Sequence, residues 1–267
     1  YVSSSIYNWS DLDNHNLDQA IIKLEKLDER FGNLKNIQKV FLHCYFNSPN
    51  TNSLFKELTS NKETDFSRYN YFYASYLAAL GKTDKAKDTV KSALRSHPRN
   101  LLLNQYKIDL KEGKNTFNFN CKNKANVVAE ILYIASNALS SQAIYPLSNF
   151  YLNLAKHLNE DFISYDTLLA ENFYEIDDFD KAKKIYKNLS KKGKAFLWYS
   201  SKQLARIYIK EENKKKALEL LSVAYNSLQS KDYYETFDYA EFLKNNEKFR
   251  ESIPYYTKII NEVKNNH

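Results

Sequence analysis

The sequence predicts an all-α protein in which antiparallel helix pairs stack into a right-handed superhelical solenoid. The first observation is a repeat of fixed period, because Ala170, Ala205 and Ala240 are 35 residues apart. A second small residue follows each of them after twelve positions, at Ala182, Ala217 and Ser252. The second observation is composition, since only 4 Gly and 4 Pro interrupt the 267 residues. Self-similarity at such a period is typical of helix pairs that bury their apolar stripes against one another.

The small residues explain how the two helices of a pair can pack closely. The distance between two helix axes follows the size of the side chains at their crossing, so Ala permits a close approach. Large residues follow four positions after the second small one, at Tyr186, Leu221 and Tyr256. We expect these large side chains to fill the groove between one pair and the next.

The most regular unit covers residues 67–100. Its small, large and Pro positions are occupied by Ala74, Leu77, Gly81, Ala86, Val90, Ala93 and Pro98. In this pattern the chain resembles the tetratricopeptide repeat of bacterial proteins, whose unit has about 34 residues. The resemblance is closest in 67–100 and in the tandem units, and looser elsewhere. It implies a superhelix whose concave groove holds a peptide or a partner segment.

Taken in order, the chain is expected to form N-terminal helix pairs over 1–112, a loop over 113–123, and C-terminal pairs over 124–267. The tandem repeats occupy 163–266. In the first pair, Asn16 and Gln19 have the spacing of a capping box. The Asn-rich, nonperiodic stretch 113–123 is expected to be exposed and to mark a boundary. Capping residues are expected to begin the second helices of the tandem units, at Asp178, Asn213 and Asn246.

The sequence leaves open the state of the cysteines, the compartment and the oligomeric state. The chain has two cysteines, Cys44 and Cys121, in no metal-binding spacing. We expect two buried thiols, with a single disulfide as the open alternative.

No apolar run is long enough to cross a membrane, so we expect a soluble protein of the cytoplasm or periplasm of a bacterium. Tyr1 falls on the first position of a repeat, which suggests a segment of a longer array, and the oligomeric state is left open.

Nothing in the sequence has the pattern of an active site. Catalysis needs convergent titratable groups, and the 5 His are scattered without a metal-binding motif. The chain also lacks a Gly-rich phosphate-binding loop. We therefore predict no enzymatic activity, no catalytic residue, no cofactor and no metal.

The resemblance assigns partner binding to the first helix of each pair. Its groove positions here hold aromatic and charged residues: Tyr71, Glu171, Tyr174, Tyr199, Lys202, Arg206, Lys210, Tyr234 and Phe237. Arg68 occupies a further groove position. Aromatic residues mixed with Arg are typical anchors of protein interfaces. The predicted function is that of a protein–protein interaction scaffold or adaptor.

The alternative function is that of a nucleic-acid-binding solenoid. The formal net charge is +7, and the stretch 181–194 is rich in Lys. These lysines are expected on the second helix of a pair, which is the convex side. The first interpretation of these lysines is a solvated face, and the second is contact with a phosphate backbone.

Overall fold

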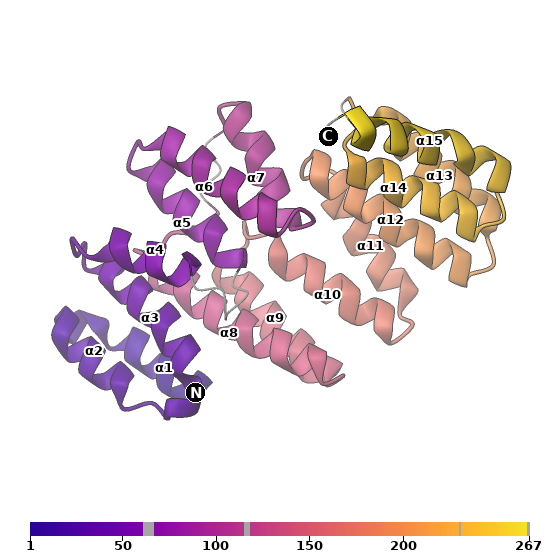
Figure 1. Ribbon diagram of the computed structural model, residues 1–267. Coiled ribbons are helices and arrows are strands. Elements are labelled where there is room, and N and C mark those ends of the chain that lie inside the picture. Colours follow the sequence, from indigo (N-terminus) through magenta and orange to yellow (C-terminus); the bar gives the residue numbers. More distant parts are fainter. Residues whose placement is uncertain (61–66, 115–117, 230, 266–267) are drawn as a thin grey trace. The chain divides into compact units, whose positions relative to one another are not determined.

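The computed structural model describes residues 1–60, 67–114, 118–229 and 231–265, with side chains up to Lys264. These residues form fifteen α-helices and two short 3-10 turns, and none of them lies in a strand (Figure 1). The predicted all-α class is therefore confirmed. Two compact units are present, Tyr1–Asn172 and Phe173–His267. The stretch 113–123, predicted as a boundary, lies inside the first unit.

The first unit contains α1 to α9 and most of α10. Their bounds are Val2–Ser10 (α1), Leu17–Glu25 (α2), Gly32–Tyr45 (α3), Thr51–Ser60 (α4), Ser67–Ala79 (α5), Thr83–Ser96 (α6), Leu101–Lys111 (α7), Lys124–Ser141 (α8), Tyr145–Leu158 (α9) and Ser164–Glu175 (α10). The second unit contains the end of α10 and five further helices: Phe179–Leu189 (α11), Lys194–Lys210 (α12), Lys214–Ser227 (α13), Tyr233–Asn245 (α14) and Phe249–Asn265 (α15). Among the described helices, none has both the length and the apolar character needed to cross a membrane.

Consecutive helices pack as pairs, as the period predicts. Helix α5 packs on α6, α8 on α9, α12 on α13 and α14 on α15. The small residues of the tandem period are all buried, namely Ala170, Ala182, Ala205, Ala217, Ala240 and Ser252. A side chain no larger than Ala at these positions lets the paired helices approach. The helix-pair architecture is therefore the one that the spacing indicates.

Helix α8 breaks the sequential order of the first unit, because it packs against α1. At the start of α8, Lys124 Nζ lies 2.7 Å from a carboxylate oxygen of Asp13, which follows α1. Further along, Glu130 of α8 binds Arg68 of α5. In a regular solenoid each repeat contacts only its neighbours. The return of α8 to α1 and α5 therefore covers a face that an open array would leave exposed.

Three of the four predicted capping residues begin a helix. The side chain of Asn16 accepts a hydrogen bond from Gln19 N, and that of Gln19 accepts one from Asn16 N, both at 3.0 Å. Asp178 caps α11, and Asn213 caps α13. The prediction for Asn246 is wrong, because this residue ends α14 and donates from Nδ2 to the Phe242 carbonyl oxygen at 2.8 Å.

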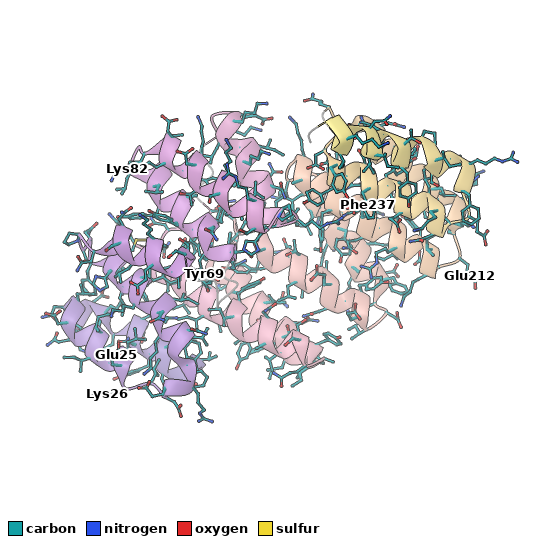
Figure 2. The ribbon with its side chains drawn as sticks, in the orientation of Figure 1. Glu25, Lys26, Tyr69, Lys82, Glu212 and Phe237 are labelled. Carbon is teal, nitrogen blue, oxygen red and sulfur yellow. A yellow bond between two sulfur atoms is a disulfide. The ribbon has the colours of Figure 1, made fainter. Side chains whose placement is uncertain are left out.

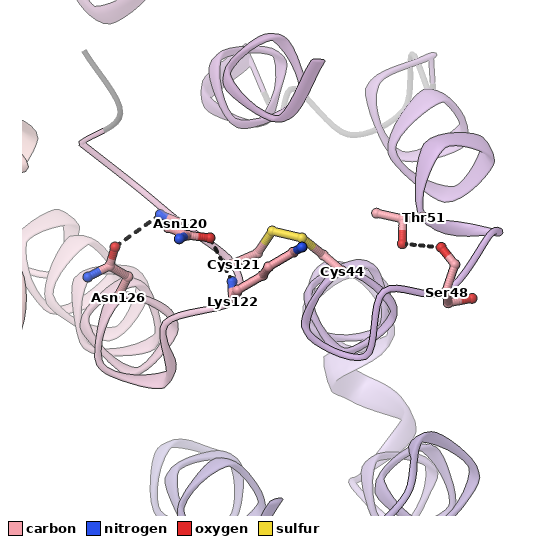
Figure 3. Close-up of a disulfide and its surroundings, with 7 residues drawn as sticks. All are labelled: Cys44, Ser48, Thr51, Asn120, Cys121, Lys122 and Asn126. Carbon is pink, nitrogen blue, oxygen red and sulfur yellow. Dashed lines mark hydrogen bonds between the residues drawn. A yellow bond between two sulfur atoms is a disulfide. The ribbon is translucent and has the colours of Figure 1, made fainter. Parts of the chain in front are cut away.

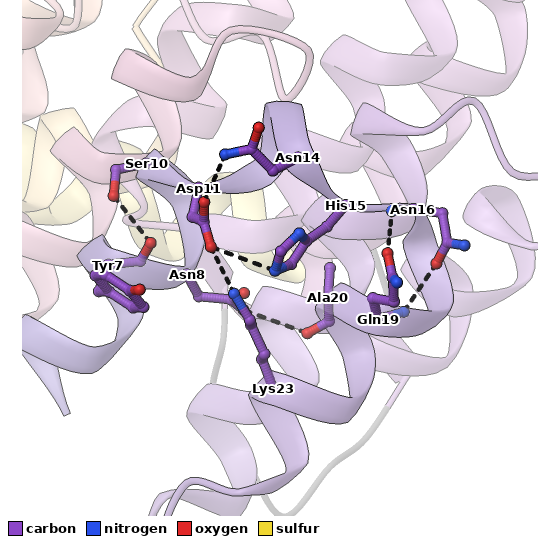
Figure 4. A network of polar contacts seen from close by, with 10 residues as sticks. All are labelled: Tyr7, Asn8, Ser10, Asp11, Asn14, His15, Asn16, Gln19, Ala20 and Lys23. Carbon is purple, nitrogen blue, oxygen red and sulfur yellow. Dashed lines mark hydrogen bonds and ion pairs between the residues drawn. The ribbon is translucent and has the colours of Figure 1, made fainter.

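Asp11, at the end of α1, joins α1 to α2 through polar contacts (Figure 4). Its carboxylate lies 2.6 Å from Lys23 Nζ and 3.3 Å from His15 Nε2, and it accepts a hydrogen bond from Asn14 Nδ2 at 2.8 Å. The hydrogen bond from Lys23 is the main reason that the pKa of Asp11 falls to about 2. Because these groups belong to neighbouring turns and helices, they fix the entry into α2.

The segment 118–123, which links α7 to α8, is partly buried, and the exposed-loop prediction is wrong for two of its residues. Gly113 and Lys114 are exposed as expected, but Phe119 and Cys121 are only 6% and 7% exposed. Cys121 forms a disulfide with Cys44 of α3, with their Cα atoms 5.9 Å apart (Figure 3). The expectation of two free thiols is therefore wrong. The sequence gives no periodic signal here, because single apolar residues alternate with Asn.

Candidate functional site

The first helices of the second unit carry seven of the nine predicted binding residues. Tyr174 lies at the end of α10, while Tyr234 and Phe237 lie on α14. The other four are spaced along one face of α12 at intervals of three or four residues: Tyr199, Lys202, Arg206 and Lys210. The opposite face of α12 is anchored in the core by Ala205 and Ile207, which are fully buried. We call the surface formed by these seven residues the first-helix face of the second unit; Tyr174 itself is buried within it, at 9% exposed.

Lys202 connects α12 to α14. Its Nζ lies 2.5 Å from a carboxylate oxygen of Asp238, and 5.8 Å from the ring centroid of Trp198. Both charged side chains are largely shielded, at 29% and 14% exposed. The charge of Lys202 is therefore already balanced within the unit, and its main role is to hold the two helices together.

Arg206 and Lys210 both cover the ring of Tyr174. The Arg206 guanidinium carbon lies 4.7 Å from the ring centroid, and Lys210 Nζ lies 5.2 Å from it. Lys210 also lies 3.6 Å from a carboxylate oxygen of Asp177. Arg206 donates from Nη1 to Gln203 Oε1 at 2.7 Å, and it forms no ion pair within the described part of the chain. Arg206 is exposed, so its guanidinium is available to a carboxylate from outside.

The aromatic residues of α14 extend this surface. Phe237 (labelled in Figure 2) is half-buried, and its ring lies 6.2 Å from Tyr233 and 6.3 Å from Tyr256, measured between centroids. The Tyr256 hydroxyl donates a hydrogen bond to Glu241, which also accepts one from Lys244 at 2.6 Å. Hydrogen bonding to Lys244, and then to Tyr256, lowers the pKa of Glu241. Part-exposed aromatic rings held in this way are suited to anchor a partner.

The two remaining predicted residues lie in the first unit. Glu171 is exposed on α10. Tyr71 is only 2% exposed, and its ring lies 4.9 Å from Tyr106 and 5.9 Å from Phe162, between centroids. The prediction that Tyr71 contacts a partner is therefore wrong, because neighbouring rings cover it. Burial raises the pKa of the Tyr71 hydroxyl.

Arg68 is likewise held inside the first unit. Its Nε donates to Glu130 Oε1 at 2.8 Å and its Nη2 donates to Glu130 Oε2 at 2.7 Å. The guanidinium carbon also lies 3.8 Å from the ring centroid of Tyr133 and 4.7 Å from that of Phe162. A bidentate pair stacked on aromatic rings is a favourable setting for Arg. No local signal predicts the pair, since its two residues lie 62 positions apart.

The described residues offer no metal site. Nowhere in them do three or more His, Cys, Asp or Glu side chains gather closely enough to hold an ion. His43 Nδ1, beside Cys44, is within hydrogen-bond distance of Ser48 Oγ at 2.8 Å, and Cys44 is in the disulfide. Both residues thus have structural roles that need no ion.

Comparison with known proteins gives similarity at the level of structure. No protein-family model and no curated protein sequence matches the chain. A tetratricopeptide repeat protein from Parabacteroides merdae has 12% identity and a TM-score of 0.40, over 89% of this chain and 92% of that one. The P58(IPK) TPR domain has 11% identity and a TM-score of 0.29, over 98% and 83%.

A third solved structure, the human IFIT1 dimer with PPP-AAAA, has 14% identity and a TM-score of 0.31, over 95% of this chain and 66% of that one. Because these scores are low, the fold assignment rests on the buried small residues and the paired helices of the chain itself. On that basis the chain is a tetratricopeptide-like, all-α helical repeat protein.

Proposed function

We propose that the protein is a non-enzymatic scaffold or adaptor that binds an acidic segment of a protein partner on the first-helix face of the second unit. The observation that carries this proposal is Arg206. Its guanidinium is exposed, lies over the Tyr174 ring and has no carboxylate partner among the described residues. Lys202 and Lys210, in contrast, already lie near Asp238 and Asp177.

The expected ligand has a carboxylate near its middle and apolar side chains on either side. The carboxylate would pair with Arg206, while the apolar side chains would lie against the rings of Tyr199 and Phe237. In such interfaces the aromatic contacts supply most of the affinity, whereas charges set register and association rate. Only the second unit takes part in this proposal, because Tyr71 of the first unit is covered.

The experiment compares two fluorescent peptides, one with a central Glu-Asp pair between Leu and Phe residues, the other with Gln-Asn in place of the acids. Fluorescence anisotropy should show tighter binding of the acidic peptide to the wild-type chain. Arg206→Glu should weaken that binding by about tenfold or more, the size expected when a charge pair becomes a repulsion. Lys187→Glu, on α11, is the matched control and should leave it unchanged. Equal affinity of the two peptides for wild type would refute the proposal.

A second candidate is nucleic-acid binding through α11 and the residues after it. Lys184, Lys187, Lys191 and Lys192 are exposed and form no ion pair with any described residue. Backbone contacts of this kind weaken steeply as salt rises. Under this alternative, Lys187→Glu with Lys191→Glu would abolish binding of a single-stranded oligonucleotide, and Arg206→Glu would not. The protein-binding proposal expects no salt-sensitive oligonucleotide binding at physiological ionic strength.

The disulfide supports a compartment more oxidising than the cytoplasm. Disulfides persist in secreted and periplasmic proteins and are rare in the cytosol. Of the two compartments that the sequence left open, the periplasm of a bacterium is therefore the one we propose.

A further inference from the structure

The segment 118–123 covers an aromatic surface of the first unit. The ring centroid of Phe119 lies 4.2 Å from that of Phe72 on α5 and 5.1 Å from that of Phe41 on α3. It also lies 6.3 Å from the ring of Phe162. Phe119 is only 6% exposed. The segment therefore packs its aromatic ring between the rings of α3 and α5.

The covered surface belongs to the first helices of their pairs. Helices α3 and α5 are followed by their pairing helices α4 and α6, as α12 and α14 are by α13 and α15. On α5, Tyr71 and Phe72 are 2% and 1% exposed. On α12 and α14, Tyr199 and Phe237 are only half-buried. In the first unit the segment therefore covers aromatic residues of the first helices. In the second unit the corresponding helices leave aromatic residues partly exposed.

The disulfide is the covalent attachment of this segment to α3. Its polar attachments run to α8, to the turn after α9 and, through the Tyr71 hydroxyl and the Asn118 backbone, to α5. Asn120 N donates to Asn126 Oδ1, and Asn159 Nδ2 donates to the Asn118 carbonyl oxygen, both at 3.0 Å. Figure 3 shows Cys121 reaching across to Cys44 on the side opposite Asn126. Without the disulfide, the packing of Phe119 and the hydrogen bond between the Tyr71 hydroxyl and the Asn118 backbone would still hold the segment against α3 and α5.

We propose that the Cys44–Cys121 disulfide is a redox latch, which keeps the 118–123 segment closed over the aromatic surface of α3 and α5. A thiol–disulfide oxidoreductase in its oxidised form is the class of reagent that would form it. One cysteine thiolate attacks the disulfide of the oxidant and releases one of its thiolates. The second cysteine thiolate then attacks the mixed disulfide, which closes Cys44–Cys121. The two cysteines lose two protons and two electrons in all, and the oxidant leaves as a dithiol.

The latch is stable in an oxidising compartment. Cys44 is 2% exposed and Cys121 is 7% exposed, and limited access slows attack by an external thiol. A reduced dithiol oxidoreductase would open it: one of its thiolates attacks the Cys44–Cys121 bond and releases one cysteine thiolate, and its second thiolate attacks the mixed disulfide and releases the other. The reductant leaves as a disulfide, and the two cysteines gain two electrons and two protons. The segment can then lift from the cluster and expose the rings of Phe41 and Phe72. The first unit then acquires an open aromatic surface that the oxidised protein lacks. This inference does not depend on the peptide-binding proposal for the second unit.

Hydrogen exchange on the full chain tests the latch. Three samples are compared: oxidised wild type, wild type reduced after folding and then alkylated, and the variant Cys44→Ser with Cys121→Ser. Reduction should speed exchange of the amides in 118–123 by about tenfold or more, as expected when a local opening becomes easier. Reduction should also make trypsin cut after Lys122, while Lys114, outside the latch, is cut equally in both states. Amides of α12 in the second unit should not change.

Reducing the folded wild type avoids any dependence on how the serine variant folds. The double variant serves as the control, because a reductant should not change its exchange rates. The latch is overturned if exchange in 118–123 is the same before and after reduction. It is also overturned if alkylation and mass spectrometry find free thiols at Cys44 and Cys121 in protein isolated from its native cells without reductant.

Discussion

At the scale of single residues, Glu130 is a charged side chain buried in the core of the first unit. It is fully buried, and Arg68 is its bidentate partner. Removing one member of a buried ion pair leaves an uncompensated charge, so Glu130→Ala should lower the free energy of unfolding by about 3–5 kcal/mol. Equilibrium urea unfolding measures this change.

A double variant separates the pair from the packing around it. Replacing both residues by apolar ones of similar size, Arg68→Met with Glu130→Leu, should restore most of the lost stability. If the double variant is as unstable as Glu130→Ala alone, the pair is not the reason for the loss.

Asp11 makes stability in the first unit depend on pH in the acid range. Its pKa in the folded protein is about 2, against an ordinary value of 3.8, chiefly because Lys23 donates a hydrogen bond to it. A group with a depressed folded-state pKa stabilises the fold above its ordinary pKa, and this contribution disappears as the pH falls from about 4 to about 2. A carboxyl NMR titration should give the Asp11 midpoint near the lower value. In Lys23→Ala the midpoint should rise; an unchanged midpoint would contradict the assigned cause.

Individual residue roles could be predicted where they depend on neighbours in the sequence. The capping box of Asn16 and Gln19 is local, and its three-residue spacing identifies it. The roles of Arg68 and Tyr71 depend on α8 and Phe162, which are distant in the sequence, so their groove positions suggested exposure that the packing removes. Asn246 is not the cap because the period of 35 residues places the position equivalent to Asp178 and Asn213 at Lys248, two residues further on. In all three units the residue before that position has a positive φ, namely Asp177, Glu212 and Glu247.

At the scale of helices, the crossing of α12 and α13 depends on small side chains. Ala205 and Ala217 are both fully buried. Enlarging Ala205 to Leu should overpack the crossing and cost about 1–3 kcal/mol of stability. Lys215→Leu, at an exposed position of α13, is the matched control and should change stability by less than about 0.5 kcal/mol. Thermal unfolding followed by circular dichroism distinguishes the two, and equal melting temperatures would show that the crossing lies elsewhere.

The helices themselves could be predicted well, and the segment between α7 and α8 could not. Regular spacing of small and large residues identifies a helix pair because every pair needs small side chains where its helices cross and large ones in the groove beside the crossing. Phe119 and Cys121 take part in the core through contacts with α3 and α5, which leave no repeat in the sequence. A short polar segment with one buried ring therefore resembles an ordinary loop.

At the scale of the whole molecule, the two units differ in what their first helices present. In the first unit α8 and the 118–123 segment cover these helices, whereas in the second unit Arg206 and several aromatic rings are accessible. The period of 35 residues is most regular in the second unit, where the groove residue Arg206 is exposed, whereas Tyr71 of the first unit is buried. The division at Asn172 could not be predicted from the sequence, because it lies within the regular pattern of α10.

The central claim is that a partner binds through the first-helix face of the second unit. Photo-crosslinking tests it most directly, with the acidic peptide carrying a benzophenone side chain beside its central carboxylates, followed by mass spectrometry of the linked fragments. The account predicts crosslinks to α12 and α14 around Arg206 and Phe237, and their loss in Arg206→Glu. Crosslinks that map to the lysines of α11, or to α5 in the oxidised protein, and that persist in Arg206→Glu would contradict it.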